Sequence, residues 1–379
     1  MIEKKNNRRE NRELNTRQVF NLILNNENGI SRIDISKKTG LSASVITGIA
    51  DKLISTKLVI ESGVIQKKES GRKAILLKTN SFGGFFASLL FCKGKIKLDV
   101  FDLERKLDAS YQIPISKSVI TGDFLINCIE DAVQYNYKYG TFFGIILILP
   151  PWHTSIYGDE RMKEEFGYCF DSEYKSRLHS FYKDIMIFTE PTTAMMAYSG
   201  VETRKTSKNI LCIESGKEIY ASFIINGRLF DRKHCTEKLA NAVINYNLIG
   251  SGKARLRDYV SEFAIRSNYE EKSGKSATFK EIADLYKKGD EIAQKVINEV
   301  AELLAQCIEG FVELLELDRV IIGGDLAILG EDFISSFYNK LIAIEPTLKI
   351  VEVKLCKDCS LATAGGAYFA FDHVFDEKL

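Results

Sequence analysis

The chain of 379 residues is long enough for two or three domains, and its 45% hydrophobic content allows a sizeable buried core. Its 52 basic and 51 acidic residues nearly cancel, no apolar run approaches the roughly 18 residues of a membrane span, and the N-terminus lacks the apolar stretch of a signal peptide. The eight cysteines are spread thinly, which indicates reduced, mostly buried thiols. These features exclude membrane, secreted and collagenous proteins and predict a cytoplasmic one.

The charge is unevenly distributed along the chain. Residues 1–80 hold 16 basic and 8 acidic side chains, a net charge of +8, whereas residues 81–379 hold 36 and 43, a net charge of −7. Neutralisation of phosphates supplies much of a protein's affinity for DNA, so a basic segment on a body that would repel DNA favours a dedicated nucleic-acid module. A solvated basic tail is the alternative interpretation.

Hydrophobic periodicity in this segment argues against a mere tail. Residues 15–26 fit a helix with one wide buried face. Ser31 and Asp34 resemble a capping box that opens a short helix, and Gly40 ends it. Ser42 then caps a third helix, which completes a helix-turn-helix whose second helix enters the major groove. The residues of this recognition helix expected to pack inward are Val45, Ile46, Ile49, Ala50, Leu53 and Ile54.

Small hydroxyl side chains lie on the outward face of the recognition helix. They allow close approach to DNA and can donate to or accept from base edges and phosphates. Residues 58–65 and 74–77 are predicted strands around a flexible basic loop, a wing that could reach a minor groove. A small helical domain that docks another protein is the alternative. The predicted DNA-binding residues are Ser42, Ser44 and Thr47 on the helix and Lys67, Lys68, Arg72 and Lys73 on the wing.

From residue 85 onward the chain alternates between strand and helix patterns. Alternating runs on either side of residues 93–95 predict a hairpin, and a helical stretch over 123–139 leads to an apolar strand that ends at Pro150. A similar order follows, with a hairpin turn at Asn226 and a long amphipathic region over 279–317. The apolar stripe of its helix over 291–317 could supply core or dimer surface, and core is the preferred interpretation. This pattern predicts a two-lobed α/β body.

Several segments carry a resemblance to a known family. They are NRREN, the helix-turn-helix ISRIDISKKTGLSASVITGIADKL, the GRK of the wing, VFDLERK, INGRLF, RVIIGGDLA and ATAGGAYFA. In their order and spacing they resemble the ROK family of repressors and sugar kinases, specifically its repressor branch, over nearly the whole chain. The resemblance implies an α/β protein with an N-terminal winged helix-turn-helix and a two-lobed actin-like (ribonuclease H-like) sugar kinase fold. Such proteins are normally dimers, and their repressors respond to a sugar or sugar phosphate.

The resemblance also sets the expected domain boundaries. Residues 1–80 are expected to form the winged helix-turn-helix domain and residues 81–379 the body. Within the body, lobe one would take residues 81–198 together with a C-terminal helix over residues 362–379, and lobe two would take residues 199–361.

The body departs from the family's kinases at the positions that carry their chemistry. The Asp-x-Gly-Gly-Thr loop that holds ATP phosphates and metal falls on residues 90–94, where Leu90 replaces the acidic group. The catalytic Asp of the Glu-Asn-Asp motif falls on Thr192, whose hydroxyl cannot accept a sugar proton at neutral pH, and Pro191 removes an amide. The second phosphate loop falls on residues 216–220 and has lost two of its three glycines. The sequence therefore predicts a catalytically inactive body with no cofactor.

The family's zinc signature, one His and three Cys, is also missing from the sequence. It should lie near residues 234–261, where Gly250 and Arg255 take cysteine positions and Arg257 takes the position of a sugar-binding Glu. Two ligands without two more are usually structural, so no metal site is predicted. The remaining pairs of ligand-type residues are His234 with Cys235 and Cys356 with Cys359.

A concave cleft between the lobes is a feature of this fold and a common kind of effector site. Arg255 and Arg257 would favour an anionic effector if they faced the cleft, but solvated helix charges are the preferred interpretation. Each candidate is also compatible with ordinary surface or hinge. The candidate effector residues are Glu190, Thr192, Thr193, Glu237 and Asn241.

Together these patterns predict a sequence-specific DNA-binding transcriptional regulator, in particular a repressor of carbohydrate-related genes. Its expected partners are double-stranded DNA, a second copy of the chain and a sugar or sugar-phosphate effector, without membrane contact. A dimer would present two recognition helices to half-sites, and ligand binding or lobe closure would change their spacing. An unconventional ATP-dependent sugar kinase of the same family is the alternative, and a regulator without effector control is a third candidate.

Overall fold

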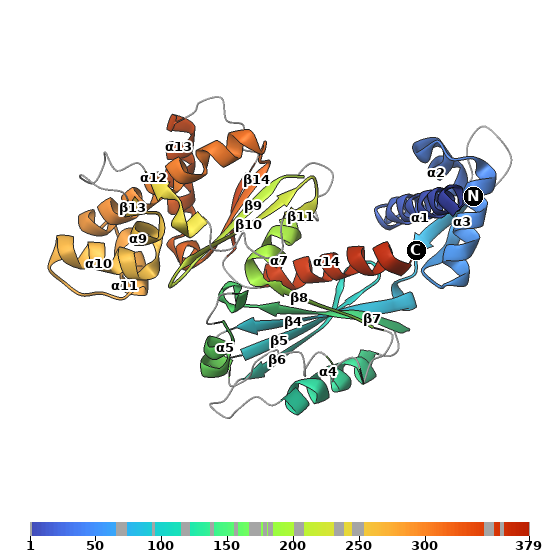
Figure 1. Ribbon diagram of the computed structural model, residues 1–379, viewed down its shortest axis with the longest axis horizontal. Coiled ribbons are helices and arrows are strands. Elements are labelled where there is room, and N and C mark those ends of the chain that lie inside the picture. Colours follow the sequence, from blue (N-terminus) through green and yellow to red (C-terminus); the bar gives the residue numbers. More distant parts are fainter. Residues whose placement is uncertain are drawn as a thin grey trace.

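The computed structural model shows an elongated molecule in which a small N-terminal domain adjoins a body of two lobes (Figure 1). It describes residues 2–65, 74–92, 95–114, 122–136, 140–154, 158–166, 176, 180, 185–200, 208–230, 239–244, 254–344, 352–356 and 360–378.

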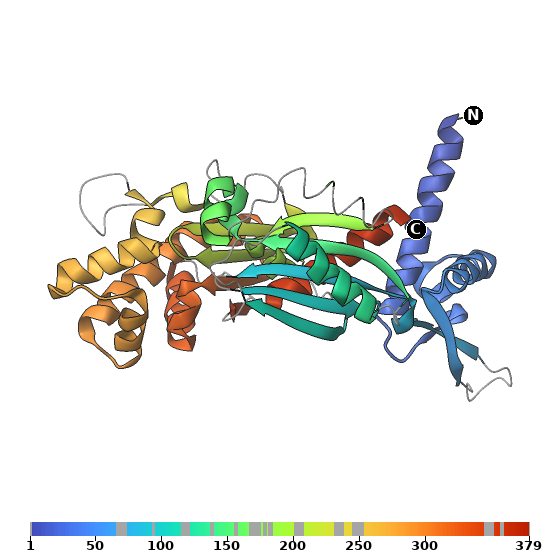
Figure 2. The same cartoon turned by 90° about the horizontal axis from the view of Figure 1, so that it is seen from below.

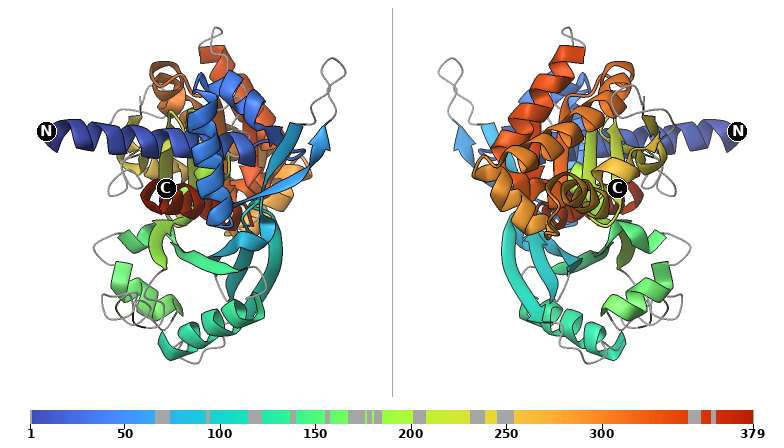
Figure 3. Two further views of the ribbon diagram at one scale, coloured as in Figure 1. Left: turned by 90° about the vertical axis from the view of Figure 1, so that its right-hand side faces the viewer. Right: turned by 90° about the vertical axis from the view of Figure 1, so that its left-hand side faces the viewer.

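Three helices and a small sheet form the N-terminal domain, which faces the viewer in the left panel of Figure 3. Its elements are α1 (Ile2–Leu24), β1 (Ile30–Ser31), α2 (Arg32–Thr39), α3 (Ala43–Ser55), β2 (Val59–Ile65) and β3 (Ala74–Thr79). The strands lie in the order β1-β3-β2, and both pairs are antiparallel. The predicted helix-turn-helix and the strands of the wing are confirmed. Helix α1 begins at Ile2 rather than near residue 15, and its N-terminal half projects from the molecule (Figure 2).

Local hydrogen bonds explain where the two helices of the motif begin and end. The side chain of Ser31 accepts from the amide of Asp34 at 3.2 Å, which confirms the predicted cap of α2, and Gly40 ends this helix with φ of 72°. Ser42 caps α3 in the same way. The prediction that Val45 packs inward is wrong, because its side chain is 40% exposed and lines a surface groove between α1 and α3.

Lobe one contains a five-stranded sheet in the order β6-β5-β4-β7-β8. Its strands are β4 (Gly84–Cys92), β5 (Lys95–Asp102), β6 (Leu107–Pro114), β7 (Thr141–Leu149) and β8 (Met186–Pro191). The pairs among β4, β5 and β6 are antiparallel, whereas β4, β7 and β8 run parallel. Helix α4 (Gly122–Asn136) covers one face of this sheet, and α14 (Ser360–Lys378) covers the other (Figure 1). Smaller elements are η1 (Ser81–Gly83), η3 (Pro151–Thr154) and α5 (Gly158–Phe166).

Burial on both faces explains the apolar sequence of β4. Phe86 and Leu90 pack toward α14, while Leu89 and Phe91 pack in the core under α4. A strand that is covered on both sides reads as a continuous hydrophobic run rather than as an alternating one. The predicted strands and helices of this lobe are confirmed, with β6 as an additional strand beyond the predicted hairpin.

Lobe two repeats the topology of lobe one, with strands in the order β11-β10-β9-β14-β15. Its strands are β9 (Ile210–Ser215), β10 (Ile219–Ile225), β11 (Arg228–Phe230), β14 (Arg319–Gly324) and β15 (Glu352–Cys356). The first three are antiparallel and the last two run parallel to β9. This repetition confirms the predicted two-lobed α/β body.

Helices and short elements on lobe two enclose a second hydrophobic core. They are η5 (Leu239–Asn241), β12 (Val243–Ile244), β13 (Ala254–Arg255), α9 (Arg257–Val260), α10 (Glu262–Ser273), α11 (Phe279–Lys287), α12 (Glu291–Leu314), η7 (Asp325–Leu329) and α13 (Glu331–Ile344). Most of the apolar stripe of α12, including Val296, Val300 and Leu304, is buried in this core as predicted, while Phe311 and Leu315 at its end are partly buried. None of the helices that the structure describes combines the length and apolar character needed to cross a bilayer.

Candidate DNA-binding surface and interlobe cavity

Side-chain hydrogen bonds from Ser36 and Thr39, which were not predicted from the sequence, fix the turn between α2 and α3. Ser36 Oγ donates to the carbonyl of Leu41 at 2.6 Å, and Thr39 Oγ1 accepts from the amide of Leu41 at 3.2 Å. Arg32 then pairs with Asp51 of α3 at 3.5 Å and with Glu61 of β2 at 3.0 Å. These contacts hold α3 in one orientation relative to β2.

The three hydroxyl residues predicted to face DNA are all exposed on α3. Ser42 Oγ lies 3.1 Å from Ser44 Oγ and accepts from the amide of Val45 at 3.5 Å. Thr47 Oγ1 donates to the carbonyl of Ala43 at 2.9 Å. Because the proton of Thr47 is used inside the helix, its free lone pair is suited to accept from an amino group on a base edge, as in adenine or cytosine.

The cationic half of the predicted surface lies outside the described residues. Strands β2 and β3 flank residues 66–73, which include Lys67, Lys68, Arg72 and Lys73. The basic contacts of the wing therefore stay predictions.

A groove between α1 and α3 adds residues that sequence reasoning missed. It has a volume of about 350 Å³, and Arg12 and Asn15 line it opposite Ser44 and Gly48. Gly48 has no atom within 4 Å of where a Cβ would be, so this side of α3 is open to an incoming group. The signal in the sequence was the polar, basic run NRREN directly before the first apolar helix pattern.

A cavity of about 220 Å³ lies between the two lobes, at the carboxyl ends of their central strands. Ligand sites in open α/β sheets form at this edge of the strands. Lobe one contributes residues from β4, η3, α5 and α7 (Thr192–Ser199), and lobe two contributes β9 and β10. The lining residues are Phe91, Cys92, Pro150, Pro151, Trp152, Arg161, Thr192, Glu214, Ser215, Gly216, Lys217, Glu218 and Tyr220.

Side chains in the cavity differ from those of a phosphoryl-transfer site. Thr192 is buried, and its hydroxyl donates to the carbonyl of Leu149 at 2.9 Å, so it is occupied by the backbone. Leu90 is fully buried and packs in the core beneath α14, away from the cavity, while its neighbours Phe91 and Cys92 line the wall. An apolar group and a hydroxyl thus occupy the two positions that would need carboxylates.

Glu214 at the end of β9 is a functional candidate that the sequence did not reveal. Thr193 Oγ1 donates to its Oε2 at 2.9 Å. The pKa of Glu214 is raised from its ordinary value of 4.5 to about 7: burial raises it most, the hydrogen bond from Thr193 lowers it, and the nearby carboxylate of Asp325 raises it. A carboxyl group that is half protonated near neutral pH can both donate and accept, which suits the hydroxyls of a polar ligand.

An aromatic ring and a cation stand on the opposite wall of the cavity. The guanidinium carbon of Arg161 lies 4.1 Å from the centroid of the Trp152 ring. A guanidinium over an aromatic face is attracted to it, and its planar set of donors can bind carboxylate or phosphate oxygens. Trp152, Tyr220 and Phe91 add apolar surface to the walls.

The remaining predicted effector residues are distributed differently. Thr193 and Glu190 are buried, and only Thr192 of this segment lines the cavity. Asn241 is exposed, and its Oδ1 accepts from Nη1 of Arg255 at 3.0 Å. Glu237 lies outside the described residues. The structure therefore places Thr192 at the cavity, Thr193 in the buried layer behind it, where it donates to Glu214, and Asn241 at the surface.

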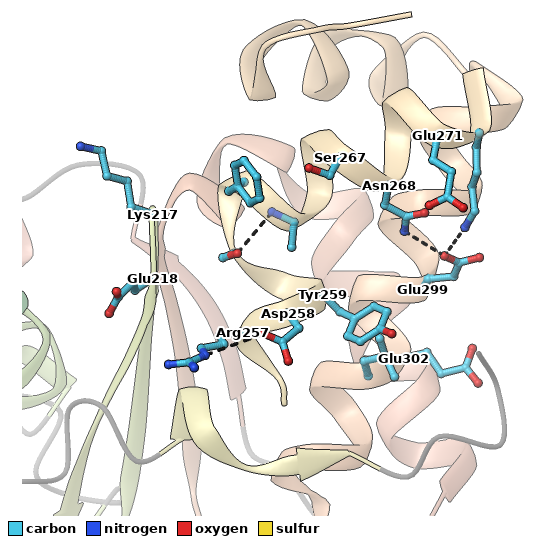
Figure 4. Close-up of a pocket in the computed structure, with 15 residues that line it drawn as sticks. Lys217, Glu218, Arg257, Asp258, Tyr259, Ser267, Asn268, Glu271, Glu299 and Glu302 are labelled. Atoms are coloured by element: carbon cyan, nitrogen blue, oxygen red, sulfur yellow. Dashed lines mark hydrogen bonds and ion pairs between the residues drawn. The ribbon is translucent and has the colours of Figure 1, made fainter. Parts of the chain in front are cut away.

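A second, larger groove of about 1,110 Å³ runs over lobe two alone, along α9, α10 and α12 (Figure 4). Arg257 is exposed at its edge, 3.7 Å from Asp258. Arg255 is also exposed and is held by Asn241, so both arginines are solvated, as preferred from the sequence. Across the parts of the chain that the structure describes, no three His, Cys, Asp or Glu side chains converge as a metal site would require.

A winged helix-turn-helix, joined to two lobes of repeated topology with a cavity at their facing strand ends, defines a winged-helix protein with an actin-like sugar kinase body. The chain belongs to the ROK family, whose model matches residues 93–371. The winged domain precedes the matched region.

Relatives of known description share this architecture. The chain is 25% identical to the xylose repressor of Staphylococcus xylosus over 296 residues, which are 75% of each protein. A crystal structure of a ROK family transcriptional regulator, described as a homologue of the E. coli Mlc protein, has a TM-score of 0.74 at 21% identity and covers 96% of this chain and 97% of that one. The ROK hexokinase of Thermus thermophilus has a TM-score of 0.61 at 15% identity and covers 76% of this chain and 99% of its own. These two structures confirm the predicted fold, and the regulator matches the N-terminal domain as well as the body.

Proposed function

We propose that this protein is a DNA-binding transcriptional repressor of carbohydrate-related genes. The observation that carries the proposal is the recognition helix α3, which is capped by Ser42, held by Arg32 and polar on its exposed face. The similarity to the xylose repressor over three quarters of both chains supports the same function. The net charge of +8 on residues 1–80 supplies the attraction to phosphates that any DNA-binding domain needs.

The proposed contacts divide into two kinds. Ser42, Ser44 and Thr47 on α3 read base edges or nearby phosphates, whereas Lys67, Lys68, Arg72 and Lys73 on the wing contact the backbone and a minor groove. A homodimer would carry two such domains and bind two half-sites separated by one helical turn or a small multiple of it. The protein acts in the cytoplasm in this proposal, where its DNA target is accessible.

The interlobe cavity is the proposed effector site, and a monosaccharide or its phosphate is the proposed ligand. A volume of about 220 Å³ suits a molecule of this size. The ring of Trp152 offers an apolar face for a sugar, Glu214 offers a hydrogen-bonding carboxyl, and Arg161 can bind an anionic substituent. Binding would alter the separation of the lobes, because these residues come from both of them.

We further infer that the body does not catalyse phosphoryl transfer. Thr192 donates its proton to the backbone, and Leu90 is buried in the core, so neither can take the part of a base or metal ligand. The alternative, an unconventional sugar kinase, rests on Glu214, because a pKa of about 7 is suited to a general base. Two features favour the repressor over the kinase: Glu214 is engaged by the hydroxyl of Thr193, and position 192, where the kinases have a catalytic carboxylate, holds a threonine.

The test is binding of the purified full-length protein to labelled DNA fragments that flank its own gene, measured by fluorescence anisotropy over a range of salt concentrations. We expect one fragment to bind at least about a thousandfold more tightly than random competitor DNA, as specific regulators do. Equal binding to the flanking fragments and to random DNA at moderate salt would contradict the proposal.

A matched control separates the recognition surface from general basic charge. Lys272 on α10 pairs with Glu299, and Lys340 on α13 pairs with Glu302. Both helices belong to lobe two, which lies at the opposite end of the molecule from the N-terminal domain (Figure 1). A Lys340→Glu variant should keep the affinity of the wild-type protein, whereas a Lys67→Glu variant should weaken binding to every sequence.

A further inference from the structure

The end of the C-terminal helix α14 is packed directly against the DNA-binding domain. The ring of Phe20 in α1 lies 5.1 Å from that of Phe375 and 5.8 Å from that of Phe371, measured between centroids. Phe86 of β4 and Phe143 of β7 complete this aromatic cluster from below. Phe20, Phe86, Phe371 and Phe375 are all at most 3% exposed, so the first helix of the domain is joined to the body by a closed hydrophobic core.

Arg105 sits above this aromatic cluster and contacts both sides. Its guanidinium carbon lies 4.6 Å from the centroid of Tyr368 and 5.7 Å from that of Phe371 in α14. Its Nη2 donates to Oδ1 of Asn25, directly after the end of α1, at 3.4 Å. One side chain from the turn between β5 and β6 therefore holds the ends of α1 and α14 together.

The backbone of Arg105 adopts a conformation that is unfavourable for most residues other than glycine. Its φ is 64°, in the left-handed region that glycine and asparagine adopt with least strain. The turn is closed by hydrogen bonds from the amide of Arg105 to the carbonyl of Asp102 at 2.9 Å and from the amide of Asp102 to the carbonyl of Lys106 at 3.1 Å. Its cation also lies over an aromatic face, an arrangement that is stabilising where water is excluded.

Helix α14 is also fixed to helix α7 and to lobe one. A Cβ on Gly365 would lie 1.8 Å from the carbonyl of Met195, so the two helices cross with their backbones in contact. Thr363 Oγ1 donates to Oδ2 of buried Asp99 at 2.6 Å, and Tyr198 donates to Asp372 at 2.8 Å. Helices α14 and α7 are therefore packed against each other as one unit.

Helix α7 in turn begins at the interlobe cavity. Its first residue, Thr192, lines the cavity, and its second, Thr193, is hydrogen-bonded to Glu214 of lobe two. At its other end, the carbonyl of Gly200 accepts from Arg319 of β14 at 3.0 Å. A single hydrophobic core contains buried residues of α1, α14, α7 and the central strands of lobe two. The contacts from the cavity to the DNA-binding domain are therefore continuous.

We propose that Arg105 and the aromatic cluster of Phe20, Phe86, Phe143, Phe371 and Phe375 are positioning residues for DNA binding. They hold α1, and with it the recognition helix, at a fixed angle to α14, so that a shift of α7 at the cavity turns the DNA-binding domain. The inference rests on the proposed function and adds to it the path between the two sites. Coupling of this kind is reciprocal, so DNA bound at α3 must also alter the cavity end of α7.

The experiment uses the full-length protein and the flanking DNA fragment that the wild-type protein selects. Hydrogen exchange is measured at α7 with and without this DNA, and small-angle X-ray scattering reports the position of the domain without DNA. The variants are Arg105→Gly, which is compatible with the positive φ, Arg105→Lys, which keeps the charge, and Phe375→Leu. The control is Phe333→Leu, the same truncation at a fully buried site in the core of lobe two.

We expect DNA to slow exchange at α7 in the wild-type protein and in Phe333→Leu. In Arg105→Gly and Phe375→Leu this response should be lost, affinity for the fragment should fall by about fivefold or more, and scattering should show a less fixed domain. Arg105→Lys should recover part of the response. If Arg105→Gly and Phe375→Leu match Phe333→Leu in hydrogen exchange, affinity and scattering, the inference is overturned and the repressor proposal stays intact.

A wild-type protein that selects no fragment would contradict the proposed function instead. In that case the scattering of the DNA-free variants still decides whether Arg105 and Phe375 set the position of the domain. An unchanged scattering curve in both variants would overturn that role as well.

Discussion

Thr193 Oγ1 donates to Oε2 of Glu214 at 2.9 Å, and this bond joins the first turn of α7 to the end of β9 in lobe two. Glu214 lines the cavity between the lobes, and Thr193 is buried directly after the cavity-lining residue Thr192. The carboxyl of Glu214 is poised near its half-protonated state, since burial raises its pKa to about 7. Its charge therefore changes over the range in which most binding measurements are made.

The first prediction concerns the pH dependence of stability. The ordinary pKa of Glu214 is 4.5, so between pH 4.5 and 7 the folded protein binds more protons here than the unfolded chain does. Stability should fall as the pH rises through this window and then level off. Glu214→Gln removes the titrating group. As the pH rises from 4.5 to 8, the free energy of unfolding of the variant, measured by thermal unfolding, should therefore increase by about 3 kcal/mol relative to that of the wild-type protein.

The control for this experiment is Glu218→Gln, which changes an exposed carboxyl group near the neighbouring strand. It should leave the pH profile unaltered. If the stability of the wild-type protein instead rises relative to that of Glu214→Gln between pH 5 and 7.5, Glu214 is charged throughout this range and the prediction is contradicted.

The second prediction separates the structural and DNA-binding roles of Ser42. Ser42→Ala removes the cap of α3 and should cost about 1 kcal/mol of stability, measured by urea unfolding. Ser42→Asp keeps a capping oxygen but adds a negative charge that faces phosphates, so it should unfold like the wild-type protein and bind DNA about tenfold more weakly. An Asp variant with full affinity would place Ser42 outside the interface.

The third prediction concerns the wing and the recognition helix. Charge reversal of Lys67, Lys68, Arg72 and Lys73 should flatten the dependence of log affinity on log salt by about 0.9 for each phosphate that the wing no longer neutralises. Thr47→Ala should instead alter the preferred sequence more than the total affinity, because Thr47 faces base edges in the proposal. The checks are salt titration for the wing and selection from a randomised duplex library for Thr47. Wing variants with an unaltered salt slope would remove the wing from the interface.

The fold was predictable where a local signal coincided with tertiary packing. The caps at Ser31 and Ser42 depend on contacts within three residues. Strand β4 is covered on both faces, and its continuous apolar sequence already indicates this burial. The cavity was predictable only in part. Thr192 and Thr193 followed from the family motif, whereas Glu214 and Arg161 reach the cavity through the packing of separate lobes, for which one sequence holds no local signal.

The contact between α1 and α14 shows the same limit more clearly. Phe20 and Phe375 lie at opposite ends of the chain, and each reads in the sequence as an ordinary core residue. Arg105 reads as part of a polar turn, because its positive φ and its position over Tyr368 arise only once β5, β6 and α14 are assembled. Long-range contacts of this kind have to be taken from the structure.

The fourth prediction concerns the effector. A thermal shift screen should include D-xylose, D-glucose and the 6-phosphate of glucose, and a true ligand at a hundred times its dissociation constant should add about 2.7 kcal/mol of stability. Trp152→Ala should abolish any such shift. Arg161→Gln should abolish only the shift from a phosphorylated sugar, because Arg161 supplies the positive charge at the cavity wall.

The control is Phe263→Ala, which changes an exposed aromatic residue at the groove on lobe two and should leave the shift unaltered. A shift that persists in Trp152→Ala would place the ligand outside the interlobe cavity.

The last prediction is that the protein transfers no phosphate from ATP to a sugar. The hydroxyl of Thr192 is hydrogen-bonded to Leu149, and Leu90 is turned into the core, so a bound sugar would meet no base at position 192 and a bound nucleotide no carboxylate for its metal at position 90. ADP release is measured with a panel of sugars under conditions in which a related ROK kinase is active. Sugar-dependent ADP release by the wild-type protein that is lost in Glu214→Gln would establish Glu214 as the base and favour the kinase over the repressor.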